Sequence, residues 1–177
     1  MQVRRKTLGE TRGINVLDSY AELWAQFLDS GSDAATLAAG ASYTSWQFGY
    51  GVEQGDRLLA YVLQGIKRAT AGALRTYEHE GEAVPRAGDF SVVTDGSGVA
   101  RCVIRTTSVD IVPFDTVDEQ FAHDEGEGDR SLAYWRQVHW DYFGRELSAM
   151  GQAATPDMSV VCERFEVVFL AASPTLG

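Results

Sequence analysis

Lys67 and Thr70 have side-chain types and a spacing that could act on an anion or a carbonyl group. They follow Gly65 in the pattern G-x-K-x-x-T, in a short loop expected after an amphipathic helix over residues 53–63. A lysine supplies a positive charge, or a base if it is desolvated, and a threonine supplies a hydroxyl that a neighbouring base can activate. The simpler interpretation is a helix end at Gly65, with Lys67 and Arg68 placed against the negative end of the helix dipole.

The G-x-K-x-x-T pattern is not a P-loop. That motif places its lysine directly before a serine or threonine and follows a strand. Here Thr70 comes three residues after Lys67, and the preceding run has a helical pattern. We therefore do not expect nucleoside triphosphate hydrolysis.

The acidic segment 124–129 is the second candidate, because it places four carboxylates in six residues around two glycines. Its carboxylates Glu125, Glu127 and Asp129 could bind a divalent metal. One carboxylate could instead act as a general acid or base, or pair with Lys67 across a cleft. An EF-hand is excluded because its spacing and final glutamate are missing. The simplest interpretation is a solvated loop whose Asp129 caps the next helix.

Aromatic and histidine residues supply weaker candidates. Trp46 and Phe48, beside the turn residue Gly49, could line a pocket or stack on a base, or they could fold over the core. His139 lies among aromatic residues at helical spacing, which is typical of a core or boundary residue rather than a catalyst.

Composition restricts the classes of function. The chain has 177 residues, a net charge of -10 and a pI of about 4.7. Because phosphate neutralisation supplies most of the affinity for duplex DNA, this charge argues against such a partner but allows a pocket for one nucleotide. Cys102 and Cys162 lie in β-branched runs and are expected to be free core thiols. Without a membrane-length apolar stretch or a signal-peptide pattern, we expect a soluble cytoplasmic protein with no membrane partner.

The elements that must position these residues have recognisable patterns. A helix is expected to begin at Ser19, with Glu22 in a capping box and an apolar stripe formed by Leu23, Trp24, Phe27 and Leu28. The other expected elements are a short helix or loop over 32–41, a short helix or irregular passage over 71–81, strands over 90–94, 99–112 and 158–169, a helix that Asp115 or Thr116 caps, and a helix over 131–147. Helices mixed with antiparallel strands predict an α+β fold.

The combined motifs resemble the ASCH domain family over residues 46–169. Most of the specificity lies in the segments G-I-K-R-A-T at 65–70 and E-G-E-G-D-R-S at 125–131. The resemblance implies a PUA-like fold, a small, mostly antiparallel β-barrel with packed helices. Residues 46–177 would form this domain, and residues 1–45 would form an N-terminal arm and helical extension.

The resemblance also implies RNA or a modified nucleoside as the ligand, and it assigns roles to residues. Some family members resemble amidohydrolases that act on N4-acetylcytidine, and others resemble ribonucleases. The amidohydrolase type uses a lysine, a threonine and a glutamate, which fall on Lys67, Thr70 and Glu125, with Glu127 as the alternative glutamate. The residues expected to bind substrate are Trp46, Phe48, Gly65, Arg68, Glu127 and Arg130.

The roles within the catalytic set stay open at this point. Thr70 could attack or position a water, Lys67 could take a proton or hold the oxyanion, and Glu125 could protonate the leaving amine. We predict that Lys67, Thr70 and a glutamate converge on one pocket, with Lys67 and Glu125 in a cleft outside the core. The first alternative is a non-catalytic RNA- or nucleotide-binding module. The second is an interaction protein whose helix from Ser19 docks a partner.

Overall fold

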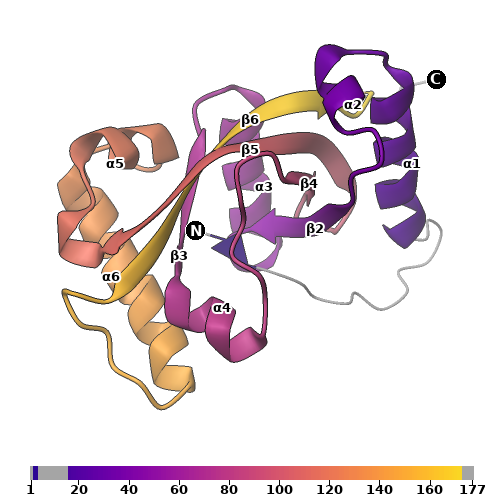
Figure 1. The fold of residues 1–177 in the computed structure, drawn as a ribbon. Coiled ribbons are helices and arrows are strands. Elements are labelled where there is room, and N and C mark those ends of the chain that lie inside the picture. The colour runs from indigo at the N-terminus through magenta and orange to yellow at the C-terminus, as the bar shows by residue number, and fades with distance from the viewer. Residues whose placement is uncertain (1, 4–15, 173–177) are drawn as a thin grey trace. The chain divides into compact units, whose positions relative to one another are not determined.

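The computed structural model describes residues 2–3 and 16–172, which form an α+β fold, as predicted (Figure 1). The chain divides into two compact units. The first unit contains Gln64–Gly88 and Thr106–Phe165. The second contains the described parts of Val3–Leu63, Asp89–Arg105 and Glu166–Gly177. A two-residue strand, β1 (Gln2–Val3), lies near the N-terminus.

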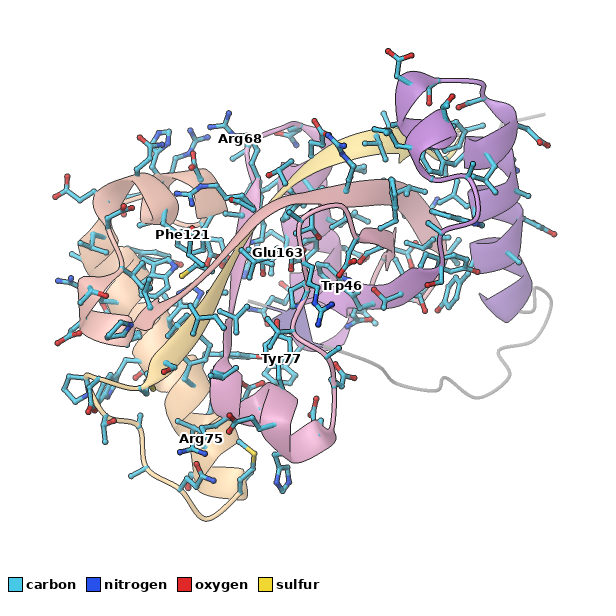
Figure 2. All side chains as sticks on the ribbon, viewed as in Figure 1. Trp46, Arg68, Arg75, Tyr77, Phe121 and Glu163 are labelled. Atoms are coloured by element: carbon cyan, nitrogen blue, oxygen red, sulfur yellow. The ribbon has the colours of Figure 1, made fainter. Side chains whose placement is uncertain are left out.

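The first unit combines strands with three α-helices from its described residues. Its elements are β3 (Ala69–Ala73), α4 (Leu74–Glu80), the 3-10 helix η1 (Phe114–Thr116), α5 (Glu119–Glu125), α6 (Leu132–Ala149), and parts of β5 (Ala100–Pro113) and β6 (Ser159–Leu170). β3 pairs antiparallel with β6 in a register that puts Thr70 opposite Glu163. Glu163 lies along β6 in Figure 2.

Small residues let this unit close around an aromatic core. Every residue of β3 is buried, and its three alanines belong to one core cluster with aromatic residues of α5 and α6. On the other face of β3, a Cβ added to Gly72 would lie 2.9 Å from the ring of Tyr77, so a larger residue there would force that ring to shift. We expected a loop through Thr70 and a short helix or irregular passage over 71–81, and α4 is that short helix. The segment 69–73 is instead a strand because of its tertiary packing.

Local caps fix the ends of α5 and α6. The Asp118 carboxylate accepts a hydrogen bond of 2.7 Å from the backbone N–H of Phe121, so Asp118 begins α5 and the prediction of Asp115 or Thr116 is wrong. Ser131 caps α6, accepting from Tyr134 at 3.1 Å. Asp129 accepts from the N–H of Ser131 at 2.8 Å, and is therefore not the cap itself.

The second unit combines strands with three α-helices among its described residues. Its elements are α1 (Val16–Asp29), α2 (Asp33–Leu37), β2 (Tyr43–Phe48), α3 (Gly51–Leu63), β4 (Phe90–Thr94), and the remaining parts of β5 and β6. β4 pairs with β2 in parallel and with β5 antiparallel. Leu23, Trp24 and Phe27 are buried, as the apolar stripe predicts, whereas Leu28 is 36% exposed.

Two details of the second unit differ from the expectations. α1 begins before Ser19, whose hydroxyl accepts a hydrogen bond from the N–H of Ala100 at 3.3 Å instead of capping a helix. Trp46 and Phe48 lie in β2 rather than around a turn, and their rings pack edge to face at 4.6 Å. In the described part of the chain, no helix has the length and apolar character needed to cross a membrane.

Candidate functional site

The backbone around Lys67 is held on both sides by parts of the first unit that are distant in sequence. Gly65, with φ +69°, ends α3 in the left-handed conformation. The N–H of Arg68 donates to Asp124 O at 2.8 Å, and the N–H of Phe165 donates to Arg68 O at 2.9 Å. These bonds fix the loop, and Lys67 as a whole residue is only 1% exposed.

Lys67 lies between two carboxylates. Its Nζ donates to Glu125 Oε2 at 2.9 Å and to Glu127 Oε1 at 2.8 Å. The side chains of Lys67 and Glu125 are 0% exposed, and that of Glu127 is 10% exposed. The three side chains, which we call the ion cluster, are thus brought together from segments about sixty residues apart.

The mutual charges of the ion cluster decide its protonation. Burial favours the neutral lysine, but the two carboxylates outweigh it, so the pKa of Lys67 is raised. Burial likewise favours neutral acids, but the ammonium of Lys67 holds the pKa of Glu125 well below its usual range and lowers that of Glu127. All three groups are therefore ionised near neutral pH, and Lys67 is an ammonium rather than a base.

A glycine allows the two glutamates to lie around Lys67. Gly126 ends α5 with φ +70°, and a Cβ added to it would lie 2.5 Å from Ile66 O. The chain can therefore turn back beside the Lys67 loop only at a glycine. The turn separates Glu125 from Glu127, so both can approach the same ammonium.

Two side chains of α6 support Glu125. The indole Nε1–H of Trp135 donates to Glu125 Oε1 at 2.9 Å. His139, one turn later, stacks on Trp135 at 4.3 Å between ring centroids and places Nε2 3.3 Å from the same oxygen. The sequence identified His139 only as a core or boundary residue. Its place in the motif W-x-x-x-H after the acidic segment was the available signal.

Asp124, next to Glu125 in the chain, joins a different set of partners. It accepts from Arg68 at 3.1 Å, from Gln120 at 3.0 Å and from Arg164 at 3.1 Å. The guanidinium of Arg164 also lies over the ring of Phe121 at 5.1 Å, and Figure 2 shows Phe121 on α5. The side chain of Arg68 is 58% exposed, so this cluster reaches solvent.

Thr70 is buried at 1% exposure within β3. Its partner in the register is Glu163, which is 2% exposed and accepts from the hydroxyl of Thr106 at 2.6 Å. Directly opposite residues of an antiparallel pair share one face of the sheet. Thr70 and Glu163 are therefore neighbours, and a catalytic role of Thr70 stays a prediction.

The remaining predicted binding residues lie in varied surroundings. Trp46 and Phe48 belong to the second unit and are buried, with 5% and 0% exposure. Arg130 has a left-handed backbone, with φ +63°. It lines a shallow pocket of about 430 Å³ together with Glu119, Gln120, His123, Ser131 and Leu132.

The three carboxylates named as possible metal ligands have protein partners in this structure. Glu125 and Glu127 hold the ammonium of Lys67, and the carboxylate of Asp129 accepts from Ser131. Within residues 2–3 and 16–172, no group of three or more histidine, cysteine, aspartate or glutamate side chains is arranged for a metal ion.

The structure corrects one geometric expectation. We predicted that Lys67 and Glu125 lie in a cleft outside the core, so that their loss would leave the fold intact. Both side chains are fully buried, because α5, α6 and the Lys67 loop close around them. Removing Lys67 leaves the buried carboxylates of Glu125 and Glu127 without the ammonium that pairs with both.

Comparisons with known proteins give one consistent result. The ASCH domain family model matches residues 44–169. The crystal structure of an ASCH domain from Lactobacillus crispatus JV V101 is similar to this chain with a TM-score of 0.80 and 32% identity, over 89% of this chain and 98% of that one. A protein from Enterococcus faecalis V583 matches with a TM-score of 0.75 and 35% identity, over 87% and 90%. No curated protein matches the chain.

Proposed function

Since the chain belongs to the ASCH domain family, we propose that it hydrolyses a nucleoside or RNA, most concretely as an amidohydrolase of the N4-acetylcytidine type. The observation that carries the proposal is the ion cluster, a lysine ammonium between two glutamates in a buried site. These are the residue types that the family resemblance assigns to catalysis. The consistency of the α+β fold with a PUA-like barrel supports a nucleic-acid or nucleoside ligand.

Lys67 acts as the electrostatic group of the proposed reaction. Hydrolysis of an amide places negative charge on the carbonyl oxygen in the transition state. Because the pKa of Lys67 is raised, its ammonium can stabilise that oxygen, whereas it has no free pair to take a proton. The structure thus favours the oxyanion role over the base role.

A glutamate acts as the base. Because its pKa is lowered, Glu127 is ionised, and its 10% exposure makes it the member of the ion cluster that water can reach. It takes a proton from water as the water oxygen bonds to the carbonyl carbon. When the C–N bond breaks, the same proton goes to the leaving amine. Thr70 positions the water in this scheme.

Incubating purified protein with N4-acetylcytidine, and separately with single-stranded RNA, tests the proposal. Glu127→Gln keeps the size of the side chain but removes the base, so we expect at least about a hundredfold lower turnover. Asp129→Asn is the matched control, because Asp129 is a solvent-exposed acid two residues away. Turnover of neither substrate by wild type, with and without added divalent metal, would contradict hydrolysis.

A second candidate function rests on a specific observation. Arg68 and Arg164 lie beside the ion cluster with side chains 58% and 30% exposed, which suits contacts with phosphate groups. The chain would then be a non-catalytic RNA- or nucleotide-binding module. Binding to single-stranded RNA should weaken as salt rises, and Arg68→Ala should reduce the salt slope by about one. Binding without turnover would favour this candidate.

A further inference from the structure

We propose that the turn over residues 126–130, between α5 and α6, is a lid that opens to admit a ligand to Lys67. The inference deepens the proposed function, because it concerns access to the same site, and it rests on that function only for the effect on turnover. The opening of the turn can be measured in the protein without a substrate.

The ion cluster needs an opening, because Lys67 and Glu125 are closed off from solvent. Both side chains are 0% exposed, whereas that of Glu127 is 10% exposed. A substrate that contacts the ammonium of Lys67 must therefore displace part of the wall around it. The turn that carries Glu127 lies at the surface, since Gly128 and Asp129 are exposed.

The other walls of the ion cluster are firmly attached. The N–H of Arg68 donates to Asp124 O at 2.8 Å, and the N–H of Phe165 donates to Arg68 O at 2.9 Å, so the loop that carries Lys67 is tied on two sides. α6 contributes Trp135 and other aromatic residues to the core cluster, so moving this helix would uncover apolar surface. The turn is therefore the part of the wall that can move at the lowest cost.

The turn itself has little to lose when it moves. Its sequence, G-E-G-D-R, contains no apolar side chain whose exposure would oppose the movement. The N–H of Gly126 donates to His123 O at 3.2 Å, and the N–H of Arg130 donates to Glu127 O at 2.9 Å. Both bonds lie within the turn and the end of α5, so a movement of the turn as a unit keeps them.

Left-handed backbone positions on both sides of Glu127 allow the turn to pivot. Gly126 has φ +70° and Gly128 has φ +56°, and glycine moves between positive and negative φ without a steric penalty. Arg130 is also left-handed, with φ +63°, which is unfavourable for a residue that has a side chain. The closed turn thus holds strain that an open form can release.

An ion pair and a ring contact hold the turn closed. Glu127 Oε1 accepts from Lys67 Nζ at 2.8 Å, and opening replaces this pair by hydration of both charges. The ring of Tyr134 on α6 lies against Gly128, since a Cβ added to that glycine would overlap the ring. Tyr134 is 38% exposed, so its removal leaves no cavity in the core. Tyr134 is therefore a latch that can be removed without changing any charge.

Chemical labelling of Lys67 measures the opening. The chain contains only two lysines, Lys6 and Lys67, so an amine-reactive reagent followed by mass spectrometry reports on each separately. Tyr134→Ala should raise the labelling rate of Lys67, relative to that of Lys6, by about tenfold. Trp140→Ala is the matched control, because Trp140 is also 38% exposed on α6 but its ring contacts Phe114. Equal rates for Lys67 in wild type and Tyr134→Ala, or equal increases in both variants, would overturn the proposal.

The urea dependence of labelling separates opening of the turn from unfolding of the whole protein. Opening the turn exposes little surface, so the free energy of opening should fall with urea by less than about a fifth of the equilibrium m-value. This dependence is measured in wild type below the unfolding transition. A slope equal to the full m-value would mean that Lys67 is reached only by global unfolding, which would overturn the proposal.

Kinetics separate the lid from the proposed function. With a hydrolysed substrate, Tyr134→Ala should lower KM by about threefold, because more molecules are open. It should also lower kcat, because Glu127 is held less firmly over the bound substrate. If no substrate is hydrolysed, the proposed function fails while the labelling results still decide whether the turn opens. Hydrolysis with unchanged kcat and KM in Tyr134→Ala would overturn the role of the turn in admitting substrate.

Discussion

Asp124 and Glu125 are adjacent acids in the last turn of α5, yet the fold uses them differently. Glu125 is fully buried and contacts one ammonium, while Asp124 contacts two guanidinium groups whose side chains are 58% and 30% exposed. A partly solvated ion pair is screened by water and is worth little, whereas a buried charge depends on its partner. Neighbouring carboxylates of similar chemistry therefore have very different energetic importance.

Within the first unit, Asp124 connects segments of the chain to one another, whereas Glu125 belongs to the buried ion cluster. Asp124 ties α5 to the Arg68 loop and to β6 through flexible side chains. Glu125 belongs to a site where desolvation strengthens every charge interaction. The same helix turn thus contributes to two different sets of contacts. One is the ion cluster, and the other is the set of ion pairs of Asp124 with Arg68 and Arg164, which we call the surface clamp.

The largest loss of stability is expected for Lys67→Met, which replaces the side chain as far as Cε and removes the charged Nζ. It leaves Glu125 and Glu127 buried without their cation, and should lower the free energy of unfolding by about 3–5 kcal/mol. Urea unfolding measures the effect. Adding Glu125→Gln and Glu127→Gln to Lys67→Met should recover part of it, and a loss below about 1 kcal/mol in Lys67→Met would contradict the comparison.

Acid should remove the same interaction without a mutation. The pKa values of Glu125 and Glu127 are lowered in the folded state. The stability that these two carboxylates contribute is therefore present above their unfolded-state pKa of about 4.3. It is lost as pH falls through their folded-state pKa values. The raised pKa of Lys67 works in the opposite sense. The stability that Lys67 contributes is present below its unfolded-state pKa of about 10.4 and is lost as pH rises through its folded-state pKa.

Urea unfolding as a function of pH measures the loss of stability at low pH, which we call the acid limb, and the loss at high pH. We expect a plateau between about pH 5 and pH 10, with stability falling on either side. Glu127→Gln should flatten the acid limb, and Asp129→Asn should change it less because Asp129 is fully exposed. An acid limb of the same slope in wild type and Glu127→Gln would contradict the assignment to the ion cluster.

Gly126→Ala should lower the stability of the protein by an intermediate amount. The change should disturb the ion cluster more than the contacts of Asp124. The added Cβ meets Ile66 O at 2.5 Å in a left-handed backbone. Such strain costs about 1–3 kcal/mol. Gly151→Ala is the control, because Gly151 is also left-handed, with φ +72°, but has open space around its Cβ. Equal losses of thermal stability in the two variants would show that the contact with Ile66 is unimportant.

The smallest effect is expected for Arg68→Ala. Its ion pair with Asp124 is largely solvated, and Arg164 remains on the same carboxylate. The free energy of unfolding should fall by about 0–1 kcal/mol. A loss as large as that of Lys67→Met would erase the distinction between the surface clamp and the ion cluster.

The sequence predicted the features that depend on local signals. Gly65 ends a helix, and Ser131 begins α6, because caps are encoded within a few residues. The hairpin of β4 and β5 follows from two strand-forming runs on either side of the turn residues 95–98. A pairing of Lys67 with the acidic segment was one alternative offered by the residue types. The choice of Glu125 came from the family resemblance, since nothing local links the two.

What the sequence missed depends on tertiary packing. The acidic segment has the composition of a solvated loop, yet Glu125 is buried because α6 brings Trp135 and His139 onto it. Thr70 lies in an alanine- and glycine-rich segment of low strand propensity, which becomes a strand only by pairing with β6. No spacing rule reports such contacts between distant segments.

The closed state of the ion cluster affects how tightly any ligand can bind. The side chains of Lys67 and Glu125 have no exposed surface, so a ligand reaches them only in a more open form of the protein. The apparent dissociation constant is then the intrinsic constant divided by the open fraction. With about 1% of molecules open, binding is about a hundredfold weaker than the contacts alone would give. Strain at Gly126 that destabilises the closed form would therefore make the protein less stable and its apparent affinity higher.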